Sequence, residues 1–158
     1  MTNFSGPDIA YAISRLGRYT NNPDHSHWIA LERVFRYLKG IINYGIHYTC
    51  FPAVIEGFSD ANWISDSDET KSTSGYVFTL AGGAVSWKSA KQTIISRSTM
   101  KAKIIALNTA TSEAEFLKNV LCDLSLLNKP IPPISMHCDS QIAISKVTSK
   151  ILMKKEDT

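Results

Sequence analysis

Apolar residues follow a helical spacing at the start of the chain. Ile9, Ile13 and Leu16 recur at intervals of three and four, and Pro7 suits the first turn of a helix. The polar run at residues 20–23 (TNNP) interrupts this spacing. We therefore expect one helix to end near residue 20.

A second helix is predicted from about Asp24 to Gly40, because glycine is favoured just past a helix end. Its apolar residues share one side, namely Trp28, Leu31, Val34, Phe35 and Leu38. These two helices form the expected N-terminal helical appendage, residues 1–43.

From residue 44 the pattern becomes typical of β-strands. Short apolar runs predict strands at residues 46–48, 54–60, 74–80 and 84–87. The last two flank Ala81-Gly82-Gly83, a turn sequence that predicts a hairpin. The segment between the second and third strands, residues 64–71, is polar and is expected to be a loop.

Helical spacing returns after the hairpin. Residues 98–127 predict a long helix with a possible break near residue 111, followed by a proline-rich connector at 130–133. A strand at 134–138 and a last helix that fades after residue 146 complete the domain, residues 44–158. The order predicts an α/β fold: a mixed sheet with an antiparallel hairpin, a parallel strand and flanking helices.

The composition is that of a globular protein, with 44% hydrophobic and 20% charged residues and a net charge of +3. No stretch has the length of a membrane span, and the N-terminus lacks the pattern of a signal peptide. We expect an intracellular protein, cytoplasmic or nuclear. Cys50, Cys122 and Cys138 are widely spaced, so we expect free thiols rather than disulfides or a zinc site.

Two aspartates stand at strand ends, on either side of the long helix. Asp60 ends the second predicted strand and Asp139 follows the strand at 134–138. A strand-end acid, a helix acid and a second strand-end acid, in that order, can build a two-metal hydrolytic centre. Here the helix offers Lys103 instead. For the two aspartates alone, capping of turns or helices is the competing interpretation.

Basic residues gather between the hairpin and the start of the long helix. Contact with nucleic-acid phosphates suits this placement, and helix N-terminal amides would assist. A solvated basic surface explains it equally well. The predicted nucleic-acid-binding residues are Lys88, Lys91, Arg97 and Ser98.

Five ordered blocks resemble the ribonuclease H domain of copia-type retrotransposon Pol polyproteins. They are residues 58–63 (FSDANW), 70–78 (TKSTSGYVF), 85–89 (VSWKS), 97–100 (RSTM) and 137–141 (HCDSQ). Residues 1–43 resemble the connection that follows the reverse transcriptase region in the same polyproteins. The resemblance implies a ribonuclease H-like fold and, as partners, an RNA–DNA hybrid and the remainder of the polyprotein.

In that family, the resemblance implies, four acids hold two Mg²⁺ ions that hydrolyse the RNA strand of the hybrid. Asp60 and Asp139 match two of them. The family's Ser-Thr-x-Glu-Ala-Glu becomes Ser98-Thr99-Met100-Lys101-Ala102-Lys103, so Lys103 occupies the place of the catalytic glutamate. The chain reaches residue 158 before the segment expected to carry the fourth acid.

Three interpretations remain open. The domain is a ribonuclease H-like domain whose nuclease activity is lost because Lys103 replaces the catalytic glutamate, and the lysine then pairs with Asp60 or Asp139. Alternatively, it is a non-catalytic nucleic-acid-binding domain, or a transposon remnant without a role. The position of the Lys103 side chain relative to the two aspartates distinguishes a related site from an unrelated one.

Overall fold

The computed structural model describes residues 6–49, 54–63, 71–124 and 131–156. A four-stranded sheet with strand order β3-β2-β1-β4 forms its centre. β1 pairs antiparallel with β2 and parallel with β4, and β2 pairs antiparallel with β3. The expected mixed α/β sheet is confirmed, and it is consistent with a ribonuclease H-like fold. The strands are β1 (Ile55–Asn62), β2 (Thr73–Leu80), β3 (Gly83–Lys91) and β4 (Ser135–Cys138).

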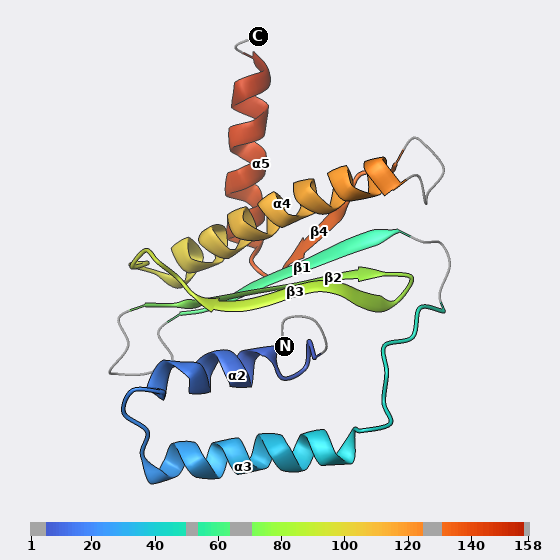
Figure 1. Ribbon diagram of the computed structural model, residues 1–158. Coiled ribbons are helices and arrows are strands. Elements are labelled where there is room, and N and C mark those ends of the chain that lie inside the picture. Colours follow the sequence, from blue (N-terminus) through green and yellow to red (C-terminus); the bar gives the residue numbers. More distant parts are fainter. Residues whose placement is uncertain (1–5, 50–53, 64–70, 125–130, 157–158) are drawn as a thin grey trace.

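Helices lie on both faces of this sheet (Figure 1). α4 (Thr99–Leu124) covers one face, and α2 (Ala10–Leu16) lies against the other, with α3 (His25–Gly40) beyond it. α5 (Gln141–Glu156) begins just after β4 and projects away from the sheet (Figure 1). A short 3₁₀ turn, Gly17–Tyr19, follows α2.

Alternation along β1 fixes which of its side chains face α4. Its residues alternate strictly between buried and exposed, beginning with buried Ile55, as expected for a strand with one covered face. Ala61 packs with Ala102 and Ala106 of α4, so the buried set faces that helix. Phe58, Asp60 and the other exposed residues of β1 therefore lie on the opposite face.

Small residues allow α4 to approach the sheet closely. The buried residues of α4 are four alanines at intervals of four, Ala102, Ala106, Ala110 and Ala114. They form one line along the helix, because residues four apart share a face. The helical spacing of the sequence predicts a core face that includes Ala110 and Ala114, and both are buried. Leu117 and Leu121 of the same predicted face are only partly buried, at the edge of the cluster around Phe78.

The hairpin between β2 and β3 has the expected tight turn. Ala81 and Gly82 both adopt positive φ, 51° and 81°, as a two-residue turn of this kind requires. Gly83 is needed for a different reason, since a Cβ there would lie 2.5 Å from the ring of Tyr48.

Several predicted boundaries are wrong. Residues 46–48 form no strand; Tyr48 instead packs on Gly83 and donates a hydrogen bond to the Ala84 carbonyl oxygen at 2.9 Å. That contact is made by a side chain, so no strand pairing accompanies it. The first helix begins at Ala10 rather than at Pro7. β3 continues to Lys91, four residues further than predicted.

Two predictions for the later helices also need correction. α4 is continuous through residue 111. The hydroxyls of Thr111 and Ser112 donate back to the carbonyl oxygens of Leu107 and Asn108 one turn earlier, so both polar side chains are accommodated within the helix. α5 continues to Glu156 instead of fading after residue 146.

α3 agrees with its predicted bounds but not with a role in the core. Asp24 caps it by accepting from the Ser26 and His27 amides, and the His27 side chain accepts from the Asp24 amide in return. Trp28 and Phe35 are 60% and 61% exposed, and no residue of α3 is buried. The division at residue 43 remains a prediction, although Arg18 donates a hydrogen bond to Thr73 of β2 at 2.9 Å.

Candidate functional site

The ends of two parallel strands bring Asp60 and Asp139 together. Ser59 of β1 pairs with Cys138 of β4, and this is the last pair between the two strands. The next residue of each chain segment is the predicted aspartate. Ser140 then caps α5 by accepting from the Ala143 amide at 3.2 Å, which turns the chain away from the sheet.

α4 places Lys103 beneath these strand ends. Ser98 precedes the helix and accepts from the Lys101 amide at 3.3 Å, as an N-cap residue does. Ala102 is fully buried against Ala61 of β1. Lys103 is the next residue of α4 after Ala102. Its side chain extends to the point where the pairing of β1 with β4 ends.

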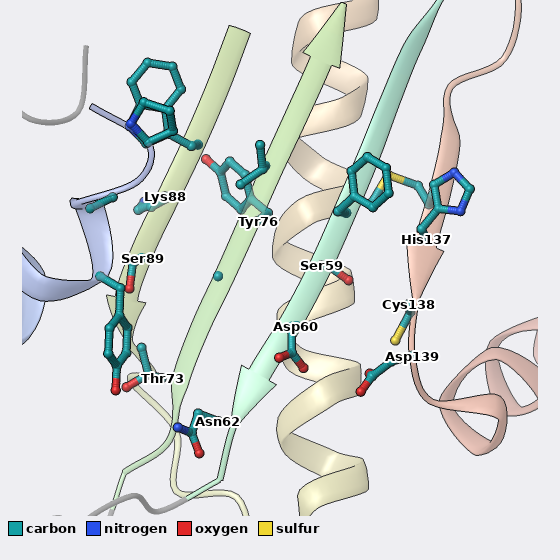
Figure 2. A pocket seen from close by; sticks show the side chains of 18 of the residues that line it. Ser59, Asp60, Asn62, Thr73, Tyr76, Lys88, Ser89, His137, Cys138 and Asp139 are labelled. Carbon is teal, nitrogen blue, oxygen red and sulfur yellow. The ribbon is translucent and has the colours of Figure 1, made fainter. Parts of the chain in front are cut away.

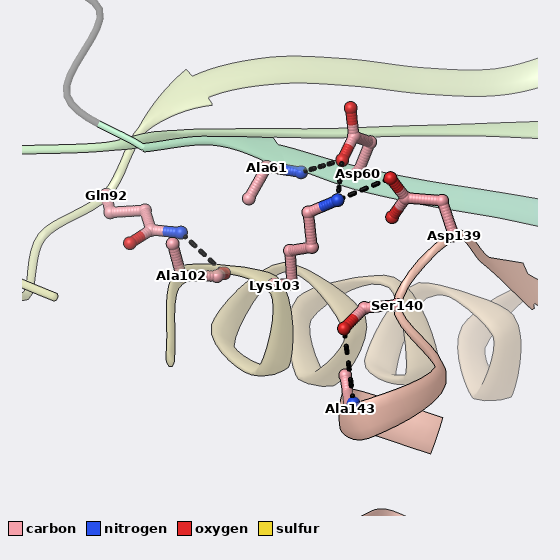
Figure 3. Close-up of polar contacts among 8 residues, drawn as sticks. All are labelled: Asp60, Ala61, Gln92, Ala102, Lys103, Asp139, Ser140 and Ala143. Atoms are coloured by element: carbon pink, nitrogen blue, oxygen red, sulfur yellow. Dashed lines mark hydrogen bonds and ion pairs between the residues drawn. The ribbon is translucent and has the colours of Figure 1, made fainter. Parts of the chain in front are cut away.

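The Lys103 ammonium lies between the two carboxylates (Figure 3). Its Nζ donates a hydrogen bond to Asp139 Oδ2 and lies 3.5 Å from Asp60 Oδ1. Lys103 is only 15% exposed, whereas the side chains of Asp60 and Asp139 are 71% and 62% exposed. The expected ion pair is therefore present, and it involves both aspartates.

The electrostatics of this cluster favour a charged lysine. The hydrogen bond to Asp139 raises the pKa of Lys103, burial opposes the rise, and the negative charges of Asp60 and Asp139 add to it. Asp60 Oδ1 also accepts from the Ala61 amide at 2.7 Å. The Ala61 amide and the Lys103 ammonium thus both approach the same oxygen of Asp60, Oδ1.

Gln92 positions this end of α4, and sequence reasoning missed it. Its buried side chain donates to the Ala102 carbonyl oxygen at 2.9 Å (Figure 3). It also donates to Ser74 Oγ at 2.7 Å. It thereby joins the end of β3 to the first turn of α4, next to Lys103. A single glutamine after a strand has no spacing signal, so the pattern did not reveal it.

The predicted nucleic-acid-binding residues are only partly brought together. Lys88 and Lys91 border a cavity of about 250 Å³ between β3 and α4, together with Ile105 and Thr109. Arg97 is exposed ahead of α4, and Ser98 caps that helix. The basic residues therefore lie along one side of the domain without forming a single pocket.

Among the described residues, no third carboxylate joins Asp60 and Asp139. Glu113 accepts from Ser86 Oγ at 2.7 Å near the outer strand β3. Burial first, and then the Glu113 charge, raise the pKa of the neighbouring Tyr76 to about 12. Asp66 and Asp68 lie outside the described residues. Within the described ranges, no three His, Cys, Asp or Glu residues are grouped so as to hold a metal ion.

The cysteines and the helix lengths were also the subject of sequence predictions. Cys122 and Cys138 are free thiols, and Cys50 falls outside the described residues. In the part of the chain that the structure describes, no helix has the length and hydrophobicity needed to cross a bilayer.

Several known proteins are similar in sequence to this chain over most of its length. A retrovirus-related Pol polyprotein from transposon TNT 1-94 of Nicotiana tabacum is 37% identical over 138 residues, which is 87% of this chain and 10% of that polyprotein. A Pol polyprotein from transposon RE2 of Arabidopsis thaliana is 35% identical over 138 residues, 87% of this chain and 9% of the polyprotein. Secreted RxLR effector protein 161 of Plasmopara viticola is 43% identical over 112 residues, 70% of this chain and 79% of the effector.

The chain is therefore similar to one segment of retrotransposon Pol polyproteins, and this similarity supports an origin in a retrotransposon. The chain spans about a tenth of the length of the transposon polyproteins it matches. No family model matches the chain. No solved structure matches it either.

Proposed function

We propose that this chain is a ribonuclease H-like domain of a copia-type retrotransposon Pol polyprotein, with its hydrolytic centre inactivated. The observation that carries this proposal is the position of the Lys103 ammonium, which contacts Asp139 and lies 3.5 Å from Asp60. The two aspartates stand at adjacent strand ends, where the resemblance expects metal ligands. The residue between them supplies a positive charge where the family supplies a negative one.

The residues present do not fit a pair of Mg²⁺ ions. A unit charge 4 Å from a divalent ion, at an effective dielectric near 20, is repelled by about 8 kcal/mol, twice the figure for two unit charges. Lys103 is largely buried, so water screens this repulsion only in part. Magnesium is usually held by few carboxylates and several waters, and such a site has little binding energy to spare.

Lys103 instead acts as an internal counter-ion. Its single positive charge lies between two carboxylates that would otherwise repel each other, and it joins α4 to the ends of β1 and β4. The ancestral arrangement of the strand ends is thereby kept without a bound cation. The proposed domain retains a nuclease-like fold, and the Lys103 ammonium lies where a metal ion would otherwise activate water.

A cleavage assay tests the loss of activity. A labelled RNA–DNA hybrid is incubated with Mg²⁺ and either the unmodified protein or the Asp60→Asn variant. We expect no cleavage above background from either protein, because neither assembles a metal site. Magnesium-dependent cleavage by the unmodified protein that disappears in Asp60→Asn would overturn the proposal.

Nucleic-acid binding without cleavage is a second candidate function. Lys88 and Lys91 border the same cavity beside β3, and Arg97 and Lys101 are exposed at the start of α4. Phosphate contacts of this kind weaken steeply as salt is added. Binding of the uncut hybrid that falls with salt, and falls further in Lys88→Glu, would support this function. If neither binding nor cleavage occurs, a remnant without a role is left.

A further inference from the structure

The face of the sheet opposite α4 carries an open groove. A cavity of about 860 Å³ extends over this face from the N-terminal part of α2 to the ends of β1 and β4. Figure 2 shows Asp60, Asn62, His137 and Asp139 among its lining residues. Gly75 faces Asp60 across the β1–β2 pairing, and a Cβ at Gly75 would have only the Lys88 carbonyl oxygen within 4 Å, at 3.6 Å. The floor of the groove is therefore open at Gly75.

Aromatic rings line one side of this groove. Phe58 of β1 pairs in register with His137 of β4, and their rings stack with centroids 4.8 Å apart and an interplanar angle of 16°. Phe58 remains 45% exposed after this contact. An exposed ring in a groove offers a flat surface on which a planar cation can stack.

Carboxylates flank the Phe58 ring along its own strand. Glu56 and Asp60 lie two residues before and after Phe58, on the same face, about 7 Å away along the strand in each direction. Asp139 lies beside Asp60 at the end of the groove, and all three acidic side chains are more than half exposed. Glu56 Oε1 is 3.9 Å from His137 Nε2.

The charge at this end of the groove is negative. Lys103 reaches Asp60 and Asp139 from the α4 side and brings one positive charge against two negative ones. Glu56, on the other side of Phe58 along β1, adds a further negative charge. Lys88, which also borders the cavity, belongs to β3, at the edge of the sheet opposite β4. A phosphate backbone over Phe58 would therefore meet net repulsion, whereas a basic peptide would be attracted.

We propose that this groove binds an arginine-bearing segment of a basic protein or peptide, with a guanidinium over Phe58 between Glu56 and Asp60. Arginine suits this arrangement better than lysine. Its planar guanidinium stacks on an aromatic face and donates in-plane hydrogen bonds to carboxylates at the same time. The site lies on the face of the sheet opposite α4 and does not depend on whether the domain cleaves or binds a hybrid.

Peptide binding tests this proposal. Fluorescence anisotropy would compare a labelled arginine–glycine peptide, a lysine–glycine peptide of equal charge and a single-stranded RNA of similar length. We expect the arginine peptide to bind most tightly. Phe58→Leu, which removes the ring but keeps an apolar residue, should weaken it about five- to tenfold. Glu56→Gln should weaken it similarly and leaves the Lys103 contacts untouched.

Glu115→Gln is the matched control, because it removes one exposed carboxylate from α4 on the other face of the sheet. It should leave the affinity unchanged. The proposal is overturned by equal losses in Glu115→Gln and Glu56→Gln, which would indicate general charge attraction. It is equally overturned by the absence of arginine-peptide binding, or by tight RNA binding that Phe58→Leu abolishes.

Discussion

At the scale of single residues, the central feature of the site is the Lys103 ammonium, which lies between Asp60 and Asp139. Sequence comparison with a family pattern located it, because the two aspartates at strand ends and the Ser-Thr-x segment before the helix are local signals. The pattern left open whether the lysine turns into the cluster or out to solvent. Packing decides this, since Ala102 is buried against β1 and Gln92 holds the same turn of α4.

Replacing Lys103 by methionine should destabilise the protein. Lys103→Met keeps an unbranched side chain but leaves Asp60 and Asp139 without their shared cation. We expect a loss of about 1 kcal/mol in the free energy of unfolding, because both carboxylates are largely exposed and solvent screens the interaction. Urea unfolding measures it, with Lys101→Met on the exposed side of the same helix as the control.

The destabilisation caused by Lys103→Met should depend on pH. The folded-state pKa of Lys103 is raised above its ordinary value of 10.5. The stabilisation is therefore fully present below pH 10.5 and disappears as the pH rises through the raised value. The gap between the unmodified protein and Lys103→Met should close in strong alkali. A gap that stays constant or widens there would refute the assignment of the stabilising charge to Lys103.

At the scale of elements, the strands and helices around the site agree with the sequence better than the periphery does. β1, β2 and the hairpin turn follow alternation and glycine signals. Residues 46–48 have the same apolar character but no partner strand, and Tyr48 packs through its ring instead. Ala102 and Ala106 of the buried line of α4 were missed, because alanines contribute little to a hydrophobic pattern although they set the distance between helix and sheet.

Gly57 should be more sensitive to substitution than Gly75, although both lie within strands. A Cβ at Gly57 would lie 2.5 Å from Met136 Sδ and from Phe78 Cε1, whereas at Gly75 the nearest atom is 3.6 Å away. We expect Gly57→Ala to cost about 1–3 kcal/mol in the free energy of unfolding through overpacking. Gly75→Ala should be neutral in the same thermal and urea measurements. Equal stability of the two variants would contradict the packing of Phe78 over β1.

At the scale of the whole molecule, one sheet presents two different faces. α4 packs closely on one face through its buried alanines, and the other face has a groove lined by Phe58, His137, Asp60 and Asp139. The mixed sheet was predictable, because hairpin signals and a helical crossover restrict the possible topologies. The groove was not, since it depends on how far α2 extends across the sheet, and the sequence pattern does not specify that.

Calorimetric titration with Mg²⁺ tests the central claim, that Lys103 occupies the place of a bound cation. The unmodified protein is compared with Lys103→Glu, which completes three carboxylates at the strand ends, and with Lys101→Glu, which makes the same charge change on an exposed position. We predict specific magnesium binding only in Lys103→Glu, and its loss when Asp60→Asn is added. Tight, Asp60-dependent magnesium binding by the unmodified protein would contradict the account.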